Sequence, residues 1–142
     1  MKTYFIDSDV LIDFFKKKPE AAKLIEELGS LGKTAISVIS VAELRAGWSN
    51  KDAAIYLPRL YNIFEVISIT QDIAEKAGEI REQHSKKGSK LPTIDALIGA
   101  TAIIYKYCLV TRNIKHFPMS EIDLYQDIYN RNAENPAFLK RG

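Results

Sequence analysis

Apolar residues fall into short runs of strand character that alternate with longer segments of helical spacing. The opening run at residues 3–6 is β-prone, and Asp7 ends it. Similar runs recur along the chain, and the pattern predicts strands at residues 3–6, 34–39, 64–69, 109–111 and 122–124. Asp7 is therefore expected at the carboxyl end of a strand.

The segments between these runs carry apolar residues three or four positions apart, which is typical of helices packed on a core. Gly29 and Gly32 are expected to form a turn after the second helical segment. Ser40, followed three residues later by Glu43, is typical of a capping box at a helix start, and Thr93 is the expected cap of a later helix. The predicted helices cover residues 9–15, 20–28, 51–62 and 71–87, and two more begin at residues 40 and 93.

Strands and helices alternate along the whole chain. Because parallel strands need crossover connections, this alternation predicts an α/β fold in which helices cover both faces of a mainly parallel sheet. In such sheets, ligands bind beyond the carboxyl ends of the strands. One domain is expected over residues 1–130, and the weakly periodic residues 131–142 are interpreted as a C-terminal extension.

Composition narrows the class of protein. The chain has 142 residues, of which 46% are apolar and 27% charged, and this excludes a disordered or fibrous chain. It contains no run of about 18 apolar residues, so no membrane helix is predicted. Asp7 and Asp9 interrupt the start where a secretory signal would be apolar, and a cytoplasmic location is expected. The net charge of +2 is too small to indicate nucleic-acid binding by itself.

Three acidic residues each lie at the end of a predicted element. Asp7 follows a strand, Glu43 lies one turn into a helix, and Asp95 lies in the first turn of another helix. Phosphodiester hydrolysis needs an activated water and compensation of charge on the leaving oxygen, which two divalent ions about 3.5 to 4 Å apart supply. Mg²⁺ prefers oxygen ligands, and no histidine or cysteine accompanies these acids as a zinc site would require. The three acids are therefore candidate ligands of Mg²⁺.

Each acid also has a structural explanation, which the residues alone leave open. Glu43 would close a capping box with Ser40, and Asp95 is favoured at a helix N-terminus by the helix dipole. Asp9 is explained as an N-cap or first-turn residue. Asp7 is harder to explain in this way, because a carboxylate directly after a buried strand loses hydration unless something compensates it.

Four segments together resemble the motif blocks of PIN-domain nucleases, most of all those of the toxins of VapBC-type toxin-antitoxin systems. The blocks occur in the order of the family and extend to about Phe117. One block alone would be a weak signal, whereas four in order are specific. They cover residues 4–13, 39–44, 95–102 and 109–113, the last followed by His116 and Phe117.

The resemblance implies a three-layer α/β/α sandwich and a Mg²⁺- or Mn²⁺-dependent endoribonuclease, with a cognate antitoxin and homodimerisation as further expectations. By position, Asp7, Glu43 and Asp95 would be the catalytic and metal-ligating residues. A fourth acid is common in the family after the last motif strand, and here that position holds Asn113. An amide oxygen can ligate a metal but brings no charge, so a second ion should bind less tightly. Thr111 would support the site by hydrogen bonding.

Basic residues border the acidic segments and are candidate contacts to the phosphate backbone of RNA. Arg45 follows Glu43, and Arg112 and Lys115 flank Asn113. Binding through such side chains would weaken as the salt concentration rises. An antitoxin is expected to lay an apolar or helical segment into a groove near the site.

Two other functions fit parts of the sequence. The residues from Asp7 to Val10 resemble the nucleophile motif of haloacid-dehalogenase-like phosphatases, in which Asp7 would form an aspartyl-phosphate and Asp9 would act as acid and base. That alternative lacks a paired-acid motif near a late strand. The other is a non-catalytic RNA- or protein-binding module in which Asn113 has weakened metal binding. The sequence leaves open whether a nuclease would be a toxin or a housekeeping enzyme, and which RNA it would cut.

Overall fold

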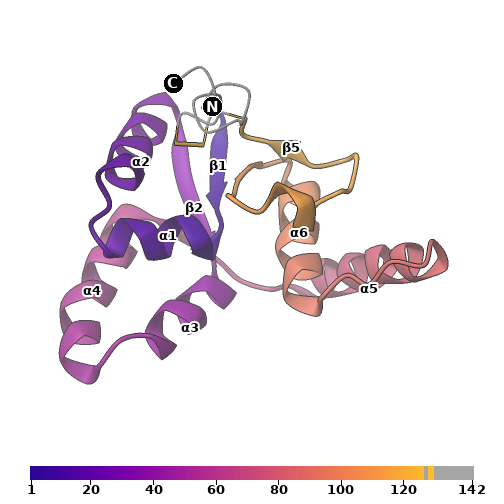
Figure 1. Ribbon diagram of the computed structural model, residues 1–142, viewed down its shortest axis with the longest axis horizontal. Coiled ribbons are helices and arrows are strands. Elements are labelled where there is room, and N and C mark those ends of the chain that lie inside the picture. The colour runs from indigo at the N-terminus through magenta and orange to yellow at the C-terminus, as the bar shows by residue number, and fades with distance from the viewer. Residues whose placement is uncertain (127, 130–142) are drawn as a thin grey trace, which may run out of the picture.

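The computed structural model describes residues 1–126 and 128–129, and a five-stranded sheet in the order β3-β2-β1-β4-β5 lies at its centre (Figure 1). All four strand pairings in this sheet are parallel, and β1 lies between β2 and β4. The strands are β1 (Thr3–Ile6), β2 (Lys33–Ser37), β3 (Glu65–Ile67), β4 (Cys108–Val110) and β5 (Asp123–Leu124). The predicted parallel sheet and its five strands are therefore confirmed.

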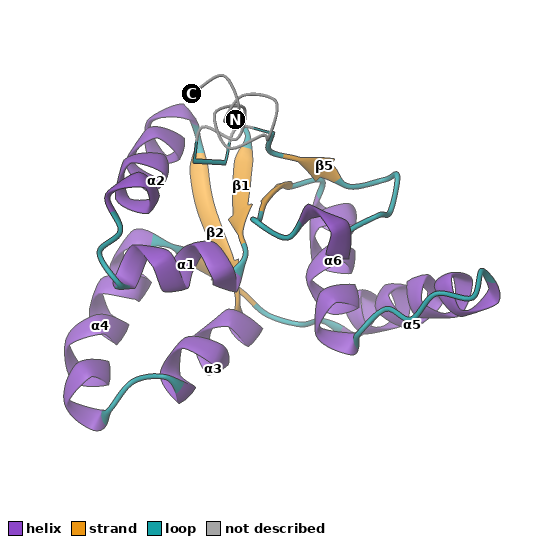
Figure 2. Ribbon diagram, viewed as in Figure 1, coloured by secondary structure: helices purple, strands orange, loops and turns teal. Residues whose placement is uncertain are grey.

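Helices cover both faces of the sheet (Figure 2). Side chains alternate along β1, so Tyr4 and Ile6 pack into one core with the first four helices, whereas Phe5 packs into a second core with the last two. This is the three-layer α/β/α sandwich that the resemblance implied. The helices are α1 (Ser8–Phe15), α2 (Pro19–Leu31), α3 (Val38–Ala46), α4 (Asn50–Ile63), α5 (Gln71–Lys86) and α6 (Thr93–Tyr105), and a short 3-10 helix, η1 (Ile114–His116), follows β4.

The order of the strands reverses direction at β1. Strands β2 and β3 extend the sheet on one side of β1, and β4 and β5 extend it on the other. Ligands commonly bind at such a switch point, beyond the carboxyl ends of the strands. Asp7 directly follows β1, and its backbone N–H donates to the carbonyl oxygen of Val110, the last residue of β4, at 2.9 Å. The segments that follow β1 and β4 therefore lie side by side.

Helix α2 is longer than predicted. It continues through Gly29 to Leu31, so the expected turn at Gly29 is wrong. Gly32 ends the helix instead, and a Cβ there would overlap the backbone carbonyl oxygen of Lys2. The close approach to the start of β1, rather than turn formation, explains a glycine at this second position.

Helix α3 begins earlier than predicted. Strand β2 ends at Ser37, which caps α3 by accepting a backbone N–H of the first turn. Ser40 is buried within the helix and Glu43 lies beyond its first turn, so the predicted capping box is wrong. Similarly, Pro92 precedes α6 and Thr93 is its first helical residue rather than its cap.

No helix in the described part of the chain has the length and apolar character that crossing a membrane requires. Cys108 is buried in β4 as a free thiol. The expected domain boundary at residue 130 and the C-terminal extension over residues 131–142 lie outside the described residues.

Candidate active site

Asp7 joins the end of β1 to the start of α1. Its Oδ1 accepts the backbone N–H of Ser8 at 2.8 Å, which caps the helix, and its Oδ2 accepts the hydroxyl of Thr111 at 2.8 Å. Burial and, after it, the charge of Asp9 raise the pKa of Asp7 to about 6. The surroundings therefore disfavour its negative charge, and a nearby cation would relieve this.

Glu43 reaches the same region from α3. Its Oε1 accepts the hydroxyl of Ser8 at 2.5 Å, and that hydroxyl lies 2.7 Å from the hydroxyl of Ser40. Ser8 is also the chain neighbour of Asp7, so one buried serine connects two of the candidate ligands. This contact places Glu43 in the same cluster as Asp7. A capping box between Ser40 and Glu43 would not have predicted it.

Asp95 lies in the first turn of α6, as predicted. Its Oδ2 is 3.3 Å from Nδ1 of His116 in η1. Burial is the main cause that raises the pKa of Asp95; the charge of His116 lowers it and that of Glu43 raises it. The charge of Asp95 in turn adds to the rise in the pKa of Asp7. Asp95 is therefore near enough to both Asp7 and Glu43 for the charges to interact.

The spacing of these carboxylates is wider than in a closed set of direct ligands. Within residues 1–126 and 128–129, no three or more His, Cys, Asp or Glu side chains are close enough together to hold one ion. Mg²⁺ usually keeps several waters and takes only one or two protein carboxylates directly. The arrangement is therefore compatible with binding in which water bridges part of the set.

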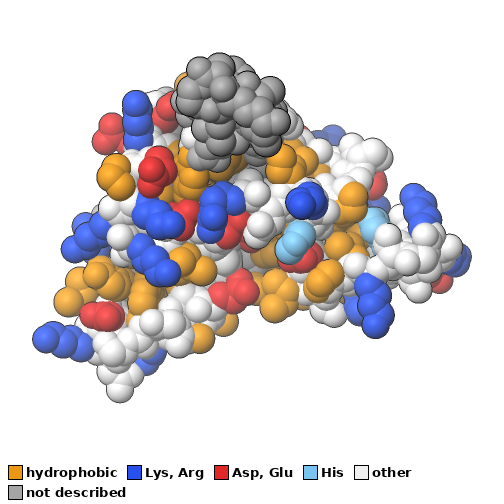
Figure 3. Space-filling model, in the orientation of Figure 1, with side chains coloured by type: hydrophobic (Ala, Val, Ile, Leu, Met, Phe, Trp, Pro, Cys, Tyr) orange, Lys and Arg blue, Asp and Glu red, His pale blue; other side chains and the backbone are white. Residues whose placement is uncertain are grey.

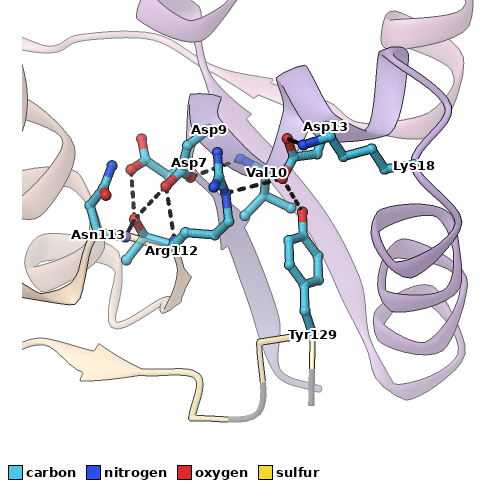
Figure 4. A network of polar contacts seen from close by, with 9 residues as sticks. Asp7, Asp9, Val10, Asp13, Lys18, Arg112, Asn113 and Tyr129 are labelled. Atoms are coloured by element: carbon cyan, nitrogen blue, oxygen red, sulfur yellow. Dashed lines mark hydrogen bonds and ion pairs between the residues drawn. The ribbon is translucent and has the colours of Figure 1, made fainter. Parts of the chain in front are cut away.

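The loop after β4 forms the other side of the site. Thr111 is buried, and its hydroxyl both donates to Asp7 and accepts the backbone N–H of Asn113 at 3.0 Å. Figure 4 shows the exposed Asn113 close to Asp7. The structure thus brings the predicted supporting residue and the predicted fourth position beside the first acid.

Asp9 holds this loop in place. Its Oδ1 accepts the backbone N–H of Val10 at 2.7 Å, and its Oδ2 accepts the backbone N–H of Arg112 at 2.9 Å. The first contact agrees with the predicted first-turn role, whereas the second joins α1 to the loop after β4. With both oxygens engaged by backbone donors, Asp9 is poorly placed to act as the acid and base of a phosphatase.

Two of the three basic side chains predicted to contact RNA are engaged within the protein. The guanidinium of Arg45 donates to a backbone carbonyl at 2.8 Å and to Asn50, across the turn between α3 and α4. Nε of Arg112 forms an ion pair with Asp13 at 3.0 Å. Lys115 lies exposed in η1. RNA contact by these three residues stays a prediction, and Lys115 is the one best placed for it.

A cavity of about 330 Å³ lies beside Asp95 and has a basic wall. Figure 3 shows histidine atoms on one face of the molecule, with lysine or arginine side chains and an acidic side chain in their vicinity. An anionic group in this cavity would meet cationic side chains next to a candidate metal ligand. The residues that line it are His84, Ser89, Lys90, Leu91, Pro92, Asp95, Lys115, His116 and Pro118.

A second groove, of about 480 Å³ and lined by aromatic side chains, adjoins Glu43. It lies between α1, α3 and α4, and its wall includes the rings of Phe15, Trp48 and Tyr56, whose centroids are 5.1 to 5.6 Å apart. Lys16 and Asp52 add opposite charges to its lining. The groove thus offers an aromatic wall next to the acidic cluster.

Ser8 and His116 both contact candidate ligands, and neither contact was expected from the sequence. Their only signal was that Ser8 occurs within the first motif segment and His116 shortly after the last. The hydroxyl of Ser8 meets Glu43 across 35 positions of the chain, and such a contact leaves no local pattern.

Residues 4–120 match the family model of the PIN domain. Ribonuclease VapC1 of Methanocaldococcus jannaschii is 36% identical over 112 residues, which are 79% of this chain and 76% of that protein. A chain in the crystal structure of VapBC2 from Rickettsia felis, bound to a DNA fragment from their promoter, has a TM-score of 0.77 and 26% identity, covering 87% of this chain and 97% of that chain.

A chain of a toxin-antitoxin complex from Klebsiella pneumoniae has a TM-score of 0.70 and 29% identity, covering 87% of this chain and 96% of that chain. The family match spans all three candidate acids, and the fold is the one that the motif segments implied. The chain therefore belongs to the PIN domain family.

Proposed function

We propose that this protein is a Mg²⁺- or Mn²⁺-dependent endoribonuclease that serves as the toxin of a toxin-antitoxin pair. One observation carries the proposal: at the strand-order switch of a PIN domain, Ser8 contacts the carboxylates of both Asp7 and Glu43, and Asp95 lies in the first turn of the helix that precedes β4. The relative named Ribonuclease VapC1 supports the activity. The resemblance to chains of toxin-antitoxin complexes supports the biological role.

The donor set fits a hard divalent cation. The three acids offer only oxygen, and Asn113 can add a neutral amide oxygen. Burial raises the pKa of Asp7 and of Asp95, and a carboxylate neighbour raises each further. A bound cation would relieve both effects. We assign Asp7, Glu43 and Asp95 as ligands, directly or through water, and Asn113 as a weaker contributor to a second ion.

When bound, the ion would supply activation of water and compensation of charge on the leaving oxygen. The chain's own groups do the positioning. Thr111 and the backbone of Ser8 fix the two oxygens of Asp7. Asp95 orients the attacking water or accepts its proton, and His116, which pairs with Oδ2 of Asp95, holds this carboxylate in place. The oxygen of the attacking water bonds to phosphorus as the bond to the 3′-oxygen breaks. The leaving 3′-oxygen takes a proton from solvent water, which leaves a 5′-phosphate and a 3′-hydroxyl.

The substrate backbone is assigned to the basic cavity beside Asp95. Lys90 and Lys115 line this cavity and are exposed. The ion pair of Asp95 is with His116, so these lysines can approach a phosphate without breaking it. A phosphate held there would lie next to the carboxylate that acts on water. Contacts of this kind bind the RNA backbone without reading its sequence.

The groove beside Glu43, with its aromatic wall, is assigned to the antitoxin. A helix or extended segment with apolar side chains would cover the aromatic wall formed by Phe15, Trp48 and Tyr56, and such a groove is a common binding mode for peptide segments. Because Glu43 itself lines the groove, the bound segment would end beside the acidic cluster. Inhibition would follow from restricted access of RNA to that cluster.

The test is cleavage of a single-stranded RNA by the purified protein with Mg²⁺, with Mn²⁺ or with EDTA. Asp7→Asn and Asp95→Asn should each abolish metal-dependent cleavage. Asp72→Asn is the matched control, because Asp72 is the exposed first-turn acid of α5 just as Asp95 is the first-turn acid of α6. The proposal fails if cleavage persists in EDTA and in both site variants, or if the wild-type protein cuts no RNA with either ion.

A further inference from the structure

The proposed reaction leaves one buried carboxylate without a role. Asp13 lies in α1 and is 3% exposed. Its Oδ1 pairs with Nζ of Lys18 at 3.2 Å, and its Oδ2 pairs with Nε of Arg112 at 3.0 Å and accepts the hydroxyl of Tyr129 at 2.8 Å (Figure 4). A charge buried in this way is destabilising unless partners compensate it, so the network is a specific arrangement rather than a chance surface contact.

Helix α1 holds Arg112 at two points. Asp9 and Asp13 are four residues apart, which places both on one face of the helix. Asp9 accepts the backbone N–H of Arg112 at 2.9 Å, while Asp13 binds its guanidinium. One arginine is thus fixed both by its main chain and by its side chain. Figure 4 shows Arg112 extended between these two carboxylates.

The residues on either side of Arg112 belong to the candidate active site. Thr111 donates its hydroxyl to Oδ2 of Asp7, and the backbone N–H of Asn113 donates to the hydroxyl of Thr111. A rotation or shift of Arg112 would therefore move the group that orients Asp7 and the amide that replaces the fourth acid. The loop is short, and its three consecutive residues cannot move independently.

We infer that Asp13 is a positioning residue for the metal site: by holding the guanidinium of Arg112 it sets the loop that aligns Thr111 and Asn113 with Asp7. The inference rests on the proposed function for its chemistry. Asp13 does not touch the candidate ligands, and it acts through Arg112. Removing a group that orients metal ligands without binding the metal itself typically changes metal affinity or activity by about 10- to 100-fold.

The network around Asp13 includes Tyr129, which lies outside the part of the chain that matches the family model. The match to the PIN domain ends at residue 120, whereas Tyr129 follows β5 and donates to the same oxygen of Asp13 that pairs with Arg112. Ile128 beside it is buried in the core that contains α1. Tyr129 is thus part of the surroundings of Asp13, and Tyr129→Phe should reproduce a smaller part of the effect of Asp13→Asn.

The experiment compares Asp13→Asn with Lys18→Ala. Both substitutions disturb the ion pairs of Asp13, but only the first removes the charge with which Arg112 pairs, because Lys18 pairs with the other carboxylate oxygen. Three readouts are needed: Mn²⁺ affinity by calorimetry, hydrogen exchange of the amides of residues 111–113, and kcat and KM for RNA. Thermal unfolding confirms that each variant is folded.

Asp13→Asn should weaken Mn²⁺ binding about tenfold, speed amide exchange at Arg112 and Asn113, and lower kcat about tenfold with KM within about twofold. Lys18→Ala should leave Mn²⁺ affinity, amide exchange and kcat within about twofold of the wild type. The inference is overturned if Asp13→Asn retains wild-type Mn²⁺ affinity and amide exchange, or if Lys18→Ala loses as much.

If Asp13→Asn does not fold, Arg112→Ala takes its place, because it removes an exposed side chain from the same ion pair. The same loss of Mn²⁺ affinity is then expected, and unchanged affinity overturns the inference. The metal and exchange measurements need no RNA. A wild-type protein that binds Mn²⁺ but cuts no RNA would therefore refute the proposed function while the role of Asp13 is still decided.

Discussion

Replacing Asp7 by asparagine is expected to stabilise the metal-free protein and to abolish its response to Mg²⁺. Burial and the charge of Asp9 raise the pKa of Asp7 from 3.8 to about 6. That difference corresponds to about 3 kcal/mol in favour of the uncharged form in the fold. Asparagine is always uncharged, so the variant avoids this cost. Its NH₂ group cannot accept the hydrogen bond that the second carboxylate oxygen accepts, and the loss of that bond lowers the stability by about 1 kcal/mol. A net gain of about 2 kcal/mol remains at pH 8.

The sign of the pH dependence follows from the same shift. The folded wild-type protein takes up a proton at Asp7 near pH 6, whereas the unfolded chain does so near 3.8. The folded state binds more protons between these values, so metal-free stability rises as the pH falls from about 7 to about 4 and is lost as the pH rises through 6. The difference in stability between Asp7→Asn and the wild type should therefore become smaller as the pH falls from about 7 to about 4.

Urea unfolding in EDTA at pH 8 and pH 5, repeated with Mg²⁺ at pH 8, measures these effects. At a Mg²⁺ concentration of about 100 times the dissociation constant, the wild type should gain about 2.7 kcal/mol, and the variant should gain almost nothing. A variant that is less stable than the wild type in EDTA at pH 8, or that is stabilised by Mg²⁺ to the same extent, would refute this reasoning.

Further expectations concern the fold, the contacts of Glu43 and the binding of RNA. Gly32→Ala should destabilise the protein by about 2 kcal/mol, because its Cβ would overlap backbone. Gly29→Ala lies in open space within α2 and should stabilise the protein by about 1 kcal/mol. Equal effects of the two substitutions in chemical denaturation would contradict this. Ser8→Ala removes the hydroxyl bound to Glu43 and should weaken Mn²⁺ binding about tenfold in calorimetry, and unchanged binding would argue against a role for that contact. Lys90→Ala and Lys115→Ala should each reduce the slope of log affinity for RNA against log salt by about 0.7, measured in EDTA, and an unaltered slope would place the phosphate elsewhere.

The sequence was sufficient to predict the layers of the fold and the position of Asp7. Alternating strand-like and helical segments predict a parallel sheet, and a carboxylate directly after a buried strand must lie at its carboxyl end. Asp95 was predictable for a similar reason, since Pro92 limits where its helix can begin. These are consequences of local pattern, and the structure agrees with them.

Contacts between distant segments were not predictable in this way. Ser40 and Glu43 have the spacing of a capping box, yet Ser37 caps the helix and Ser40 is buried against Ser8. A capping box is a local preference, and burial of the serine against α1 took precedence over it. The pairing of Asp13 with Arg112 joins two elements far apart in the chain, so only the folded arrangement of β1 and β4 brings these residues together.

The central claim is that Asp7, Glu43 and Asp95 jointly bind a divalent ion. Anomalous diffraction from crystals soaked in Mn²⁺ tests it most directly, because manganese can be located without assumptions about its ligands. The account predicts a peak among these three side chains, with at least one carboxylate oxygen bound directly and the others reached directly or through water. A Mn²⁺ peak confined to another part of the molecule, or none at millimolar Mn²⁺, would contradict it.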